Sequence, residues 1–133
     1  MLTDFPKRAA PYTYDDVGPH LELLPLIEIV ATRFVSRKAH TTMTALAAGK
    51  GNRCFIIGEP VANWQDMDLT KERVELTIDG NKIQSSVGGH PDPRPANLVV
   101  WQANHLNNRG AMLKKGDVIA TGTPGGVGYV RKP

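Results

Sequence analysis

A single carboxylate inside an apolar segment is the first feature of this sequence that could carry chemistry. Glu28 lies in a mostly apolar, β-branched run over residues 26–35. A carboxylate that is removed from water must be paired, coordinated or neutralised. Arg33 lies five residues further on, and this odd spacing places the two side chains on opposite faces of a regular strand. Two interpretations of Glu28 stay open: a salt bridge to another Arg or Lys, and a metal-binding or catalytic role.

A glycine-rich segment near the end of the chain is the second candidate. Residues 122–128 contain four glycines and Pro124. Glycines allow a backbone to approach a ligand closely. The segment lacks the Lys-Ser/Thr of a phosphate-binding loop, and no helical pattern follows it as in a dinucleotide-binding fingerprint. An ordinary turn and a ligand-contacting loop both fit this pattern.

The remaining reactive side chains lack the spacing of a recognisable site. The four histidines show no metal-ligand spacing, and no Gly-x-Ser-x-Gly motif is present. Cys54, the only cysteine, lies in an apolar run and is predicted to be a buried structural residue. A single cysteine excludes an internal disulfide and fits a reducing compartment.

The elements that must position these residues are mainly strands. Strands are predicted over residues 26–35 and 53–57, and a short one over 118–121. Residues 74–78 and 81–87 alternate around Asp79-Gly80, which predicts a hairpin.

Helices are predicted in two places, with one short turn between them. The first begins with Thr13 as N-cap and reaches about Leu24. The second is amphipathic, begins at Pro95 and ends at Gly110. Residues 36–52 are predicted to be a loop with a helical turn near residues 42–47. Because strands and helices do not alternate regularly, we expect an α+β, mostly β chain rather than a doubly wound sheet.

Composition narrows the class of protein. The chain has 133 residues, of which 41% are hydrophobic and 22% charged, as in one ordinary globular domain over residues 1–133. The net charge of +3 is scattered and only 6% of residues are aromatic, which disfavours nucleic-acid binding. The apolar stretches are shorter than the ~20 residues of a membrane span, and no signal peptide is visible. We therefore expect a cytoplasmic protein that binds no membrane.

Several segments, taken in order, carry a family resemblance. The chain resembles the C-terminal part of the 2-keto-4-pentenoate hydratases and 4-oxalocrotonate decarboxylases, which belong to the fumarylacetoacetate hydrolase superfamily. Residues 121–128 are more similar to the hydrolase branch of that superfamily. The segments that carry the resemblance are residues 10–13, 27–34, 55–61, 88–91, 101–104 and 115–119.

The resemblance implies a fold and a chemistry. It implies a mixed β-roll in a homo-oligomer, with Mg²⁺ or Mn²⁺ on three carboxylates chelating a small 2-keto acid and stabilising its enolate. Glu28 matches the last of the three metal ligands. Thr123, with Gly122 beside it, matches a substrate-contacting position. Lys50 echoes, offset by one residue, the Gly-Lys of the hydrolase branch, and is the candidate catalytic residue.

The sequence also departs from the family pattern. The Glu-x-Glu ligand pair is expected just upstream of Thr3, residues 48–51 stand where hydratases carry Asp-Asn-x-Ser, and a final strand is expected after Pro133. We therefore expect a roll that is incomplete at both ends and a chain that lacks hydratase turnover on its own.

Three functions fit these observations. The first is a 2-keto acid hydratase-like lyase that hydrates 2-hydroxypentadienoate-type substrates in aromatic catabolism. The second is an acylpyruvate-type C–C hydrolase or a 4-oxalocrotonate decarboxylase. The third is a non-catalytic partner subunit of an active paralogue.

Overall fold

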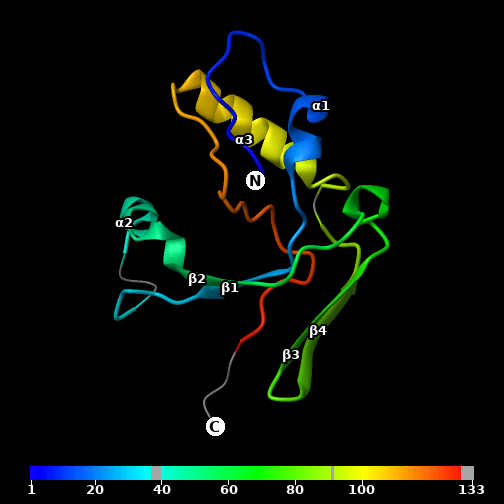
Figure 1. Ribbon diagram of the computed structural model, residues 1–133. Helices are drawn as coiled ribbons and strands as arrows, with labels where there is room; N and C mark the ends of the chain where they lie inside the picture. Colours follow the sequence, from blue (N-terminus) through cyan, green and yellow to red (C-terminus); the bar gives the residue numbers. More distant parts are fainter. Residues whose placement is uncertain (37–39, 91, 130–133) are drawn as a thin grey trace. The chain divides into compact units, whose positions relative to one another are not determined.

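The computed structural model describes residues 1–36, 40–90 and 92–129 and shows an α+β chain with two antiparallel sheets (Figure 1). The chain divides into two compact units, which we call unit 1 (residues 1–22 and 63–133) and unit 2 (residues 23–62). The α+β class agrees with the prediction, whereas the mostly β content, the β-roll and the single domain remain predictions. No helix of the described residues is long and apolar enough to cross a membrane.

Unit 1 begins with a short capped helix. α1 spans Tyr14–Val17, and Thr13 is its N-cap, as the sequence predicted. The structure adds a reciprocal capping box between Thr13 and Asp16. A 3-10 helix, η1, follows over Gly18–His20 with Pro19 in its first turn. The predicted extension to Leu24 is wrong, because the chain becomes extended at Leu21, where φ is −102° and ψ is 146°.

The buried core of unit 1 is built around one long helix. α3 spans Ala96–Asn108 and ends before Gly110, which has a φ of 74°, in agreement with the prediction. Its buried positions recur every three or four residues, so one face packs inward. The core combines this face with the N-terminal segment and the stretch after α3: Phe5, Tyr12, Val17, Leu21, Ala96, Val99, Ala103 and Leu113.

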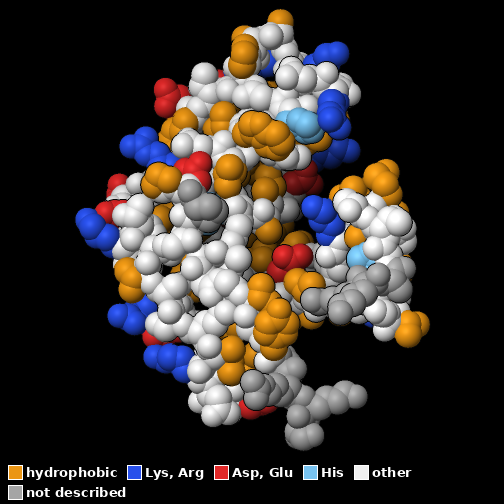
Figure 2. All heavy atoms as spheres, turned by 180° about the vertical axis from the view of Figure 1, so that it is seen from behind, with side chains coloured by type: hydrophobic (Ala, Val, Ile, Leu, Met, Phe, Trp, Pro, Cys, Tyr) orange, Lys and Arg blue, Asp and Glu red, His pale blue; other side chains and the backbone are white. Residues whose placement is uncertain are grey.

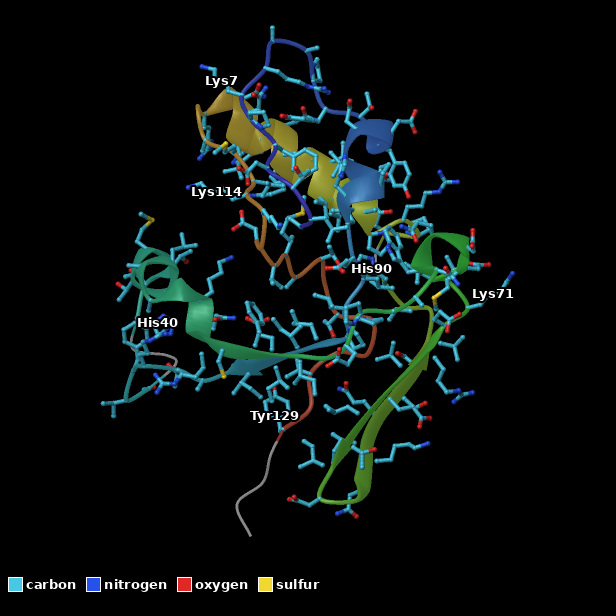
Figure 3. All side chains as sticks on the ribbon, in the orientation of Figure 1. Lys7, His40, Lys71, His90, Lys114 and Tyr129 are labelled. Atoms are coloured by element: carbon cyan, nitrogen blue, oxygen red, sulfur yellow. The ribbon has the colours of Figure 1, made fainter. Side chains whose placement is uncertain are left out.

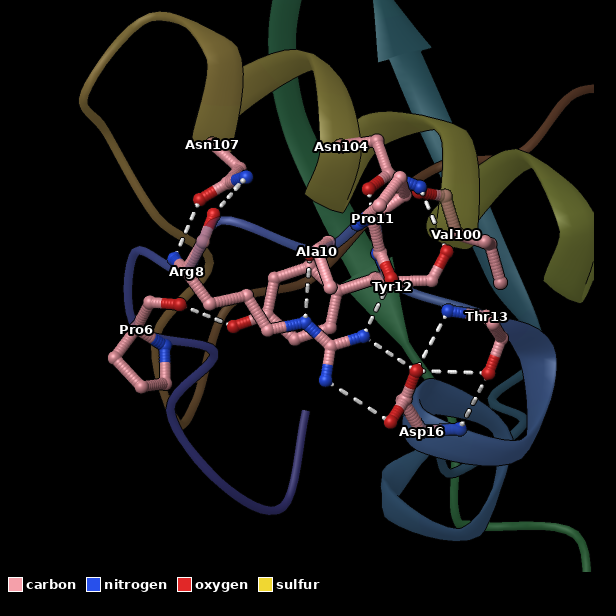
Figure 4. A network of polar contacts seen from close by, with 10 residues as sticks. All are labelled: Pro6, Arg8, Ala10, Pro11, Tyr12, Thr13, Asp16, Val100, Asn104 and Asn107. Carbon is pink, nitrogen blue, oxygen red and sulfur yellow. Dashed lines mark hydrogen bonds and ion pairs between the residues drawn. The ribbon is translucent and has the colours of Figure 1, made fainter.

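Two asparagines of α3 bind the backbone of the N-terminal segment (Figure 4). Asn107 accepts from the Arg8 N–H and donates to the Arg8 carbonyl, both at 2.9 Å. Asn104 accepts from the Tyr12 N–H at 2.7 Å and donates to the Tyr12 carbonyl at 2.9 Å. Each amide therefore pairs with the backbone as a neighbouring strand would, and this holds an irregular segment against the helix.

An ion pair closes the same network. The Arg8 guanidinium lies 4.0 Å from the centre of the Tyr12 ring and donates to Asp16 through Nη1 at 3.1 Å and Nη2 at 2.5 Å. Arg8 and the N–H and hydroxyl of Thr13 hold the pKa of the Asp16 carboxyl well below its usual range. The negative charge of Asp16 also favours the N-terminus of α1.

A hairpin forms the sheet of unit 1. β3 spans Arg73–Ile78 and pairs antiparallel with β4, which spans Asn81–Val87. Asp79 and Gly80 form the turn with φ values of 49° and 75°, as the Asp-Gly pair predicted. A second 3-10 helix of this unit, η3, spans Trp64–Asp66. The predicted strand over residues 118–121 is wrong, because those residues pair with no strand in the described part of the chain.

Unit 2 is a second, separate ribbon with a short helix. β1 spans Leu26–Val30 and pairs antiparallel with β2, which spans Asn52–Ile57. α2 spans Thr42–Ala47 and is capped by Thr41, and η2 spans Gly49–Gly51. The predicted helical turn and second strand are confirmed. The predicted first strand stops at Val30, five residues early, and residues 37–39 of the predicted loop lie outside the described residues.

The apolar strands of unit 2 are exposed rather than buried, which corrects the sequence prediction. Ile27 is 43% exposed, Ile56 is 55% exposed, and Cys54 is exposed as well. Hydrophobic side chains of this kind are visible at the surface in Figure 2. The physical reason is that a two-stranded ribbon has two open faces, and the described residues of unit 2 supply no buried layer against either.

Candidate functional site

A pocket in unit 2 has room for a small molecule. Its volume is about 330 Å³, within the range of small-ligand sites. The end of β1, the segment after it, α2 and η2 all contribute to its wall. The lining residues are Val30, Thr32, Arg33, Phe34, His40, Ala45, Ala48, Lys50 and Gly51.

Glycine-containing backbone geometry brings Lys50 to this pocket. Lys50 has a φ of 53° and Gly51 a φ of 86°, so the chain turns sharply between α2 and β2. The Ala31 N–H donates to the Gly51 carbonyl at 2.8 Å, which ties the turn to the end of β1. A Cβ at Gly51 would lie 3.5 Å from a methyl of Val30, and its positive φ would strain any larger residue. The predicted catalytic residue therefore lines the pocket, on a turn that glycine makes possible.

Arg33 fastens the same turn from the other side. Its guanidinium donates to the Ala48 carbonyl and, at 3.0 Å, to the Asn52 carbonyl. Arg33 is therefore held by two backbone acceptors on either side of Lys50. Both acceptors are neutral carbonyl groups, so they do not neutralise the positive charge of Arg33.

Glu28 is linked to the pocket through one amide. The Asn52 side chain donates to Glu28 Oε1 at 2.7 Å, and the Asn52 carbonyl accepts from Arg33. Glu28 is exposed, so the premise of a buried carboxylate is wrong. None of the ion pairs among the described residues includes Glu28, so the partner found for it is neutral.

The donor set near Glu28 does not compose a complete metal site. Mg²⁺ and Ca²⁺ take six or more oxygen ligands, of which carboxylates and water are the usual ones. Among the described residues, no group of three or more His, Cys, Asp or Glu side chains could hold a metal ion. Glu28 provides one carboxylate, and one of its oxygens already accepts from Asn52. These residues alone therefore do not fit the predicted Mg²⁺ or Mn²⁺ centre.

The pocket is suited to a small anion with an apolar tail. Arg33 and Lys50 bring positive charge to it, and the described residues that line it include no carboxylate. The His40 ring lies 4.5 Å from that of Phe34, centre to centre, and Figure 3 shows His40 in the part of unit 2 that carries α2. Charge-assisted hydrogen bonds to a carboxylate are about twice as strong as neutral ones. A carboxylate could therefore bind at the cations while carbon atoms contact Phe34 and Val30.

The predicted substrate-contacting residues lie in unit 1 and are described separately. The Thr123 hydroxyl donates to the Gly126 carbonyl at 3.0 Å and accepts from the Gly126 N–H at 3.1 Å. Thr123 and Gly126 thus close a tight turn. The structure brings Glu28 and Lys50 into unit 2, and Gly122 and Thr123 into unit 1.

The hairpin beneath this turn carries an unsatisfied hydroxyl. A Cβ at Gly125 would lie 3.3 Å from Gln84 Oε1 and 3.7 Å from Ser86 Oγ, so the turn passes close over β4. Among the buried side-chain nitrogen and oxygen atoms of the described residues, Ser86 Oγ is the one without a hydrogen-bond partner. Such a group favours a site that a polar ligand or water completes.

Sequence reasoning missed three contributors to the unit 2 site. Arg33 was considered only as a possible partner of Glu28, His40 was considered only as one of four histidines without metal-ligand spacing, and Asn52 was not considered. Their roles depend on pairing between the end of β1 and the start of β2, where Val30 faces Asn52. The glycines on either side of Lys50 were the one local signal that the backbone turns sharply there.

Comparison with known proteins agrees with the resemblance seen in the sequence. The family model for the fumarylacetoacetate (FAA) hydrolase C-terminal domain matches residues 23–133. A 2-keto-4-pentenoate hydratase of Paraburkholderia phymatum is 28% identical over 111 residues, which cover 84% of this chain and 42% of that protein. A 2-hydroxyhexa-2,4-dienoate hydratase of Comamonas testosteroni is 30% identical over 112 residues, which cover 84% of this chain and 42% of the relative.

A decarboxylase is similar to the same extent. The 4-oxalocrotonate decarboxylase of Pseudomonas sp. strain CF600 is 28% identical over 100 residues, which cover 75% of this chain and 38% of the relative. The chain therefore spans about two fifths of the length of these curated relatives. The match over residues 23–133 places the chain in the fumarylacetoacetate hydrolase C-terminal family.

Proposed function

We propose that this chain carries the substrate-binding part of a 2-keto acid hydratase-like lyase. Its substrate class would be the 2-hydroxypentadienoate-type acids of aromatic catabolism. The observation that carries the proposal is the unit 2 pocket, whose lining includes Lys50 and Arg33 and, among the described residues, no carboxylate. Relatives named as hydratases support the reaction type.

The pocket supplies two things that such a reaction needs. Lys50 and Arg33 would hold the carboxylate and would oppose the negative charge that develops on the keto oxygen when an enolate forms. Lys50 is exposed, and it takes part in none of the ion pairs among the described residues, so its ammonium group is available for a ligand. The family resemblance also assigns substrate contact to Gly122 and Thr123.

The metal remains a separate part of the proposal. Members of the superfamily generally depend on a divalent metal ion, and Glu28 would provide one oxygen ligand to Mg²⁺ or Mn²⁺. A metal bound there would polarise the keto oxygen as a Lewis acid. Because the described residues supply no complete ligand set, we derive no step through the metal. Further ligands would come from a second copy of the chain or from a paralogous subunit. Completing the metal site is therefore the role that we propose for an oligomer.

A decarboxylase is the second candidate, because the relative from Pseudomonas sp. strain CF600 carries that name. Its substrate, 4-oxalocrotonate, has two carboxylates, whereas a hydratase substrate has one. The unit 2 pocket combines Arg33 and Lys50 with the apolar Val30 and Phe34, which favours an acid with one carboxylate and an apolar chain. An acylpyruvate-type hydrolase is favoured only by the glycine-rich segment of residues 122–128.

Ligand affinity tests the proposal directly. Calorimetry should show binding of 2-oxovalerate, with valerate, which lacks the keto group, bound more weakly. 4-Oxalocrotonate should bind no better than the monoanion. Absence of 2-oxovalerate binding, with and without Mn²⁺, would contradict the proposal, and a clear preference for 4-oxalocrotonate would favour the decarboxylase. Turnover of 2-hydroxypentadienoate by the pure chain would disprove only the predicted lack of activity.

A further inference from the structure

Two loops of unit 1 that lie far apart in the sequence meet without room for an extra carbon atom. One contains Gly88 to His90, directly after β4, and the other contains Thr121 to Gly126. A Cβ at Gly89 would lie 2.6 Å from the Pro124 carbonyl oxygen, and Gly89 has a φ of 79°. This contact is closer than a real Cβ tolerates, so Gly89 permits the two loops to touch.

The first loop is itself firmly attached. The Gly88 N–H donates to the Glu72 carbonyl at 2.9 Å, which continues the hairpin ladder by one residue. Gly88 is buried, and a Cβ there would lie 2.2 Å from the Thr70 carbonyl oxygen. The residue that follows Gly89 therefore starts from a fixed backbone.

His90 joins this fixed loop to the second one. Its Nε2 lies 3.0 Å from the Thr121 carbonyl oxygen, whereas its Nδ1 lies 2.7 Å from the carbonyl oxygen of Asp92 and 3.0 Å from the nitrogen of the same residue. A ring that carries a proton on Nε2 donates to the Thr121 carbonyl, and its Nδ1 then accepts from the Asp92 N–H. The ring is partly buried, and Figure 3 shows it on the segment between β4 and α3.

The start of the second loop is held by packing of Ile119 against the core rather than by backbone hydrogen bonds. Among the described residues, no backbone-to-backbone hydrogen bond outside helices and strands involves residues 118–129. Within the loop, the Thr123 hydroxyl bonds Gly126, which shapes the turn but does not attach it to the rest of the unit. The His90 ring therefore supplies the hydrogen bond to Thr121, one residue before Gly122.

We propose that His90 is a positioning residue that holds the Thr121 carbonyl and thereby fixes Gly122 and Thr123 for contact with substrate. The proposal rests on the proposed function, because that function assigns substrate contact to Gly122 and Thr123. It does not give His90 a chemical step. Its effect is to keep the glycine-rich turn in one place before a ligand arrives.

Two conservative variants of His90 distinguish its hydrogen bond to Thr121 from its contact with the nearby Asp92. In His90→Gln the side-chain amide can reach the place of Nε2 and donate to Thr121. In His90→Asn the shorter side chain can accept from Asp92 but does not reach Thr121. Amide exchange at Gly126, measured by NMR, reports the turn, and the helical circular dichroism of α3 shows that both variants fold.

We expect His90→Asn to speed exchange at Gly126 and weaken 2-oxovalerate binding by about two- to tenfold, the ratio that corresponds to one net hydrogen bond. His90→Gln should stay closer to wild type in both measurements. Equal behaviour of the two variants, or unchanged exchange in both, would overturn the proposal. If exchange responds as expected but the wild-type chain takes up no 2-oxovalerate, the attachment by His90 is confirmed and the proposed function fails.

Discussion

Units 1 and 2 differ in what holds their backbones in place. Among the described residues of unit 1, eight apolar side chains are buried in one core around α3. In unit 2 none of the described residues is buried, although both strands are apolar. Unit 2 instead keeps its shape near the pocket through hydrogen bonds from Arg33 and Asn52 and through glycine turns. A core fixes the scaffold in one unit, while polar contacts and backbone geometry shape the site in the other.

The largest expected difference between the two units is the loss of stability when an apolar side chain is truncated. Phe5 is 4% exposed and meets Tyr12 edge-to-face at 5.5 Å, whereas Ile56 is 55% exposed. Phe5→Ala should lower the free energy of unfolding by about 3–5 kcal/mol, because a large cavity forms in the core. Ile56→Ala should cost less than about 1 kcal/mol. Urea unfolding followed by circular dichroism measures both, and similar losses would show that unit 2 has a core of its own.

A smaller effect should come from the side chains that bind backbone in unit 1. Asn107→Ala removes the buried amide that pairs with both the N–H and the carbonyl of Arg8. The substitution should lower the free energy of unfolding by about 1–3 kcal/mol. Asn97 lies on the exposed part of the same helix, so Asn97→Ala makes the same change in helix propensity without that loss. The difference between the two variants in urea unfolding isolates the backbone contacts. Equal unfolding free energies would show that these contacts add nothing.

The smallest effect should appear in acid. Because Arg8 and Thr13 lower the pKa of Asp16 in the folded chain, the folded state binds this proton less readily than the unfolded state. The stabilisation is therefore present above the ordinary aspartate pKa of about 4 and is lost as the pH falls below it. The melting temperature of the wild type should fall more steeply than that of Asp16→Asn between about pH 5 and pH 2.

The neighbouring carboxylate gives the control for this measurement. Asp15 is exposed in the same helical turn, so Asp15→Asn should follow the wild-type pH curve. A wild-type curve that runs parallel to that of Asp16→Asn would mean that the ion pair with Arg8 does not stabilise unit 1.

The elements that the sequence predicted well are those with local signals. The Asp79-Gly80 turn and the Thr13 cap are fixed by residues next to them, so their positions follow from short-range chemistry. The exposure of Glu28 and its partner Asn52 could not be predicted this way, because the two residues are 24 positions apart. The same holds for Asn104 and Asn107, whose backbone partners lie 92 and 99 residues away.

Burial was the property that hydrophobic pattern predicted least well. Residues 26–30 and 52–57 have the composition of buried strands, and pattern alone cannot show how many layers pack against a ribbon. The location of the candidate site could not be predicted from local pattern either. Lys50 was identified from a family resemblance, whereas the pocket that it lines depends on the end of β1 meeting the turn before β2.

The most direct test of the central claim is an NMR titration of the chain with 2-oxovalerate, performed on the wild type and on two matched lysine variants. Lys50→Met removes charge from the unit 2 pocket, and Lys7→Met removes an exposed charge from unit 1 (Figure 3). We expect Lys50→Met to weaken binding about tenfold or more, since a hydrogen bond to a charged group is lost, and Lys7→Met to leave it unchanged. Equal affinity of Lys50→Met and the wild type would contradict a carboxylate-binding role for the pocket.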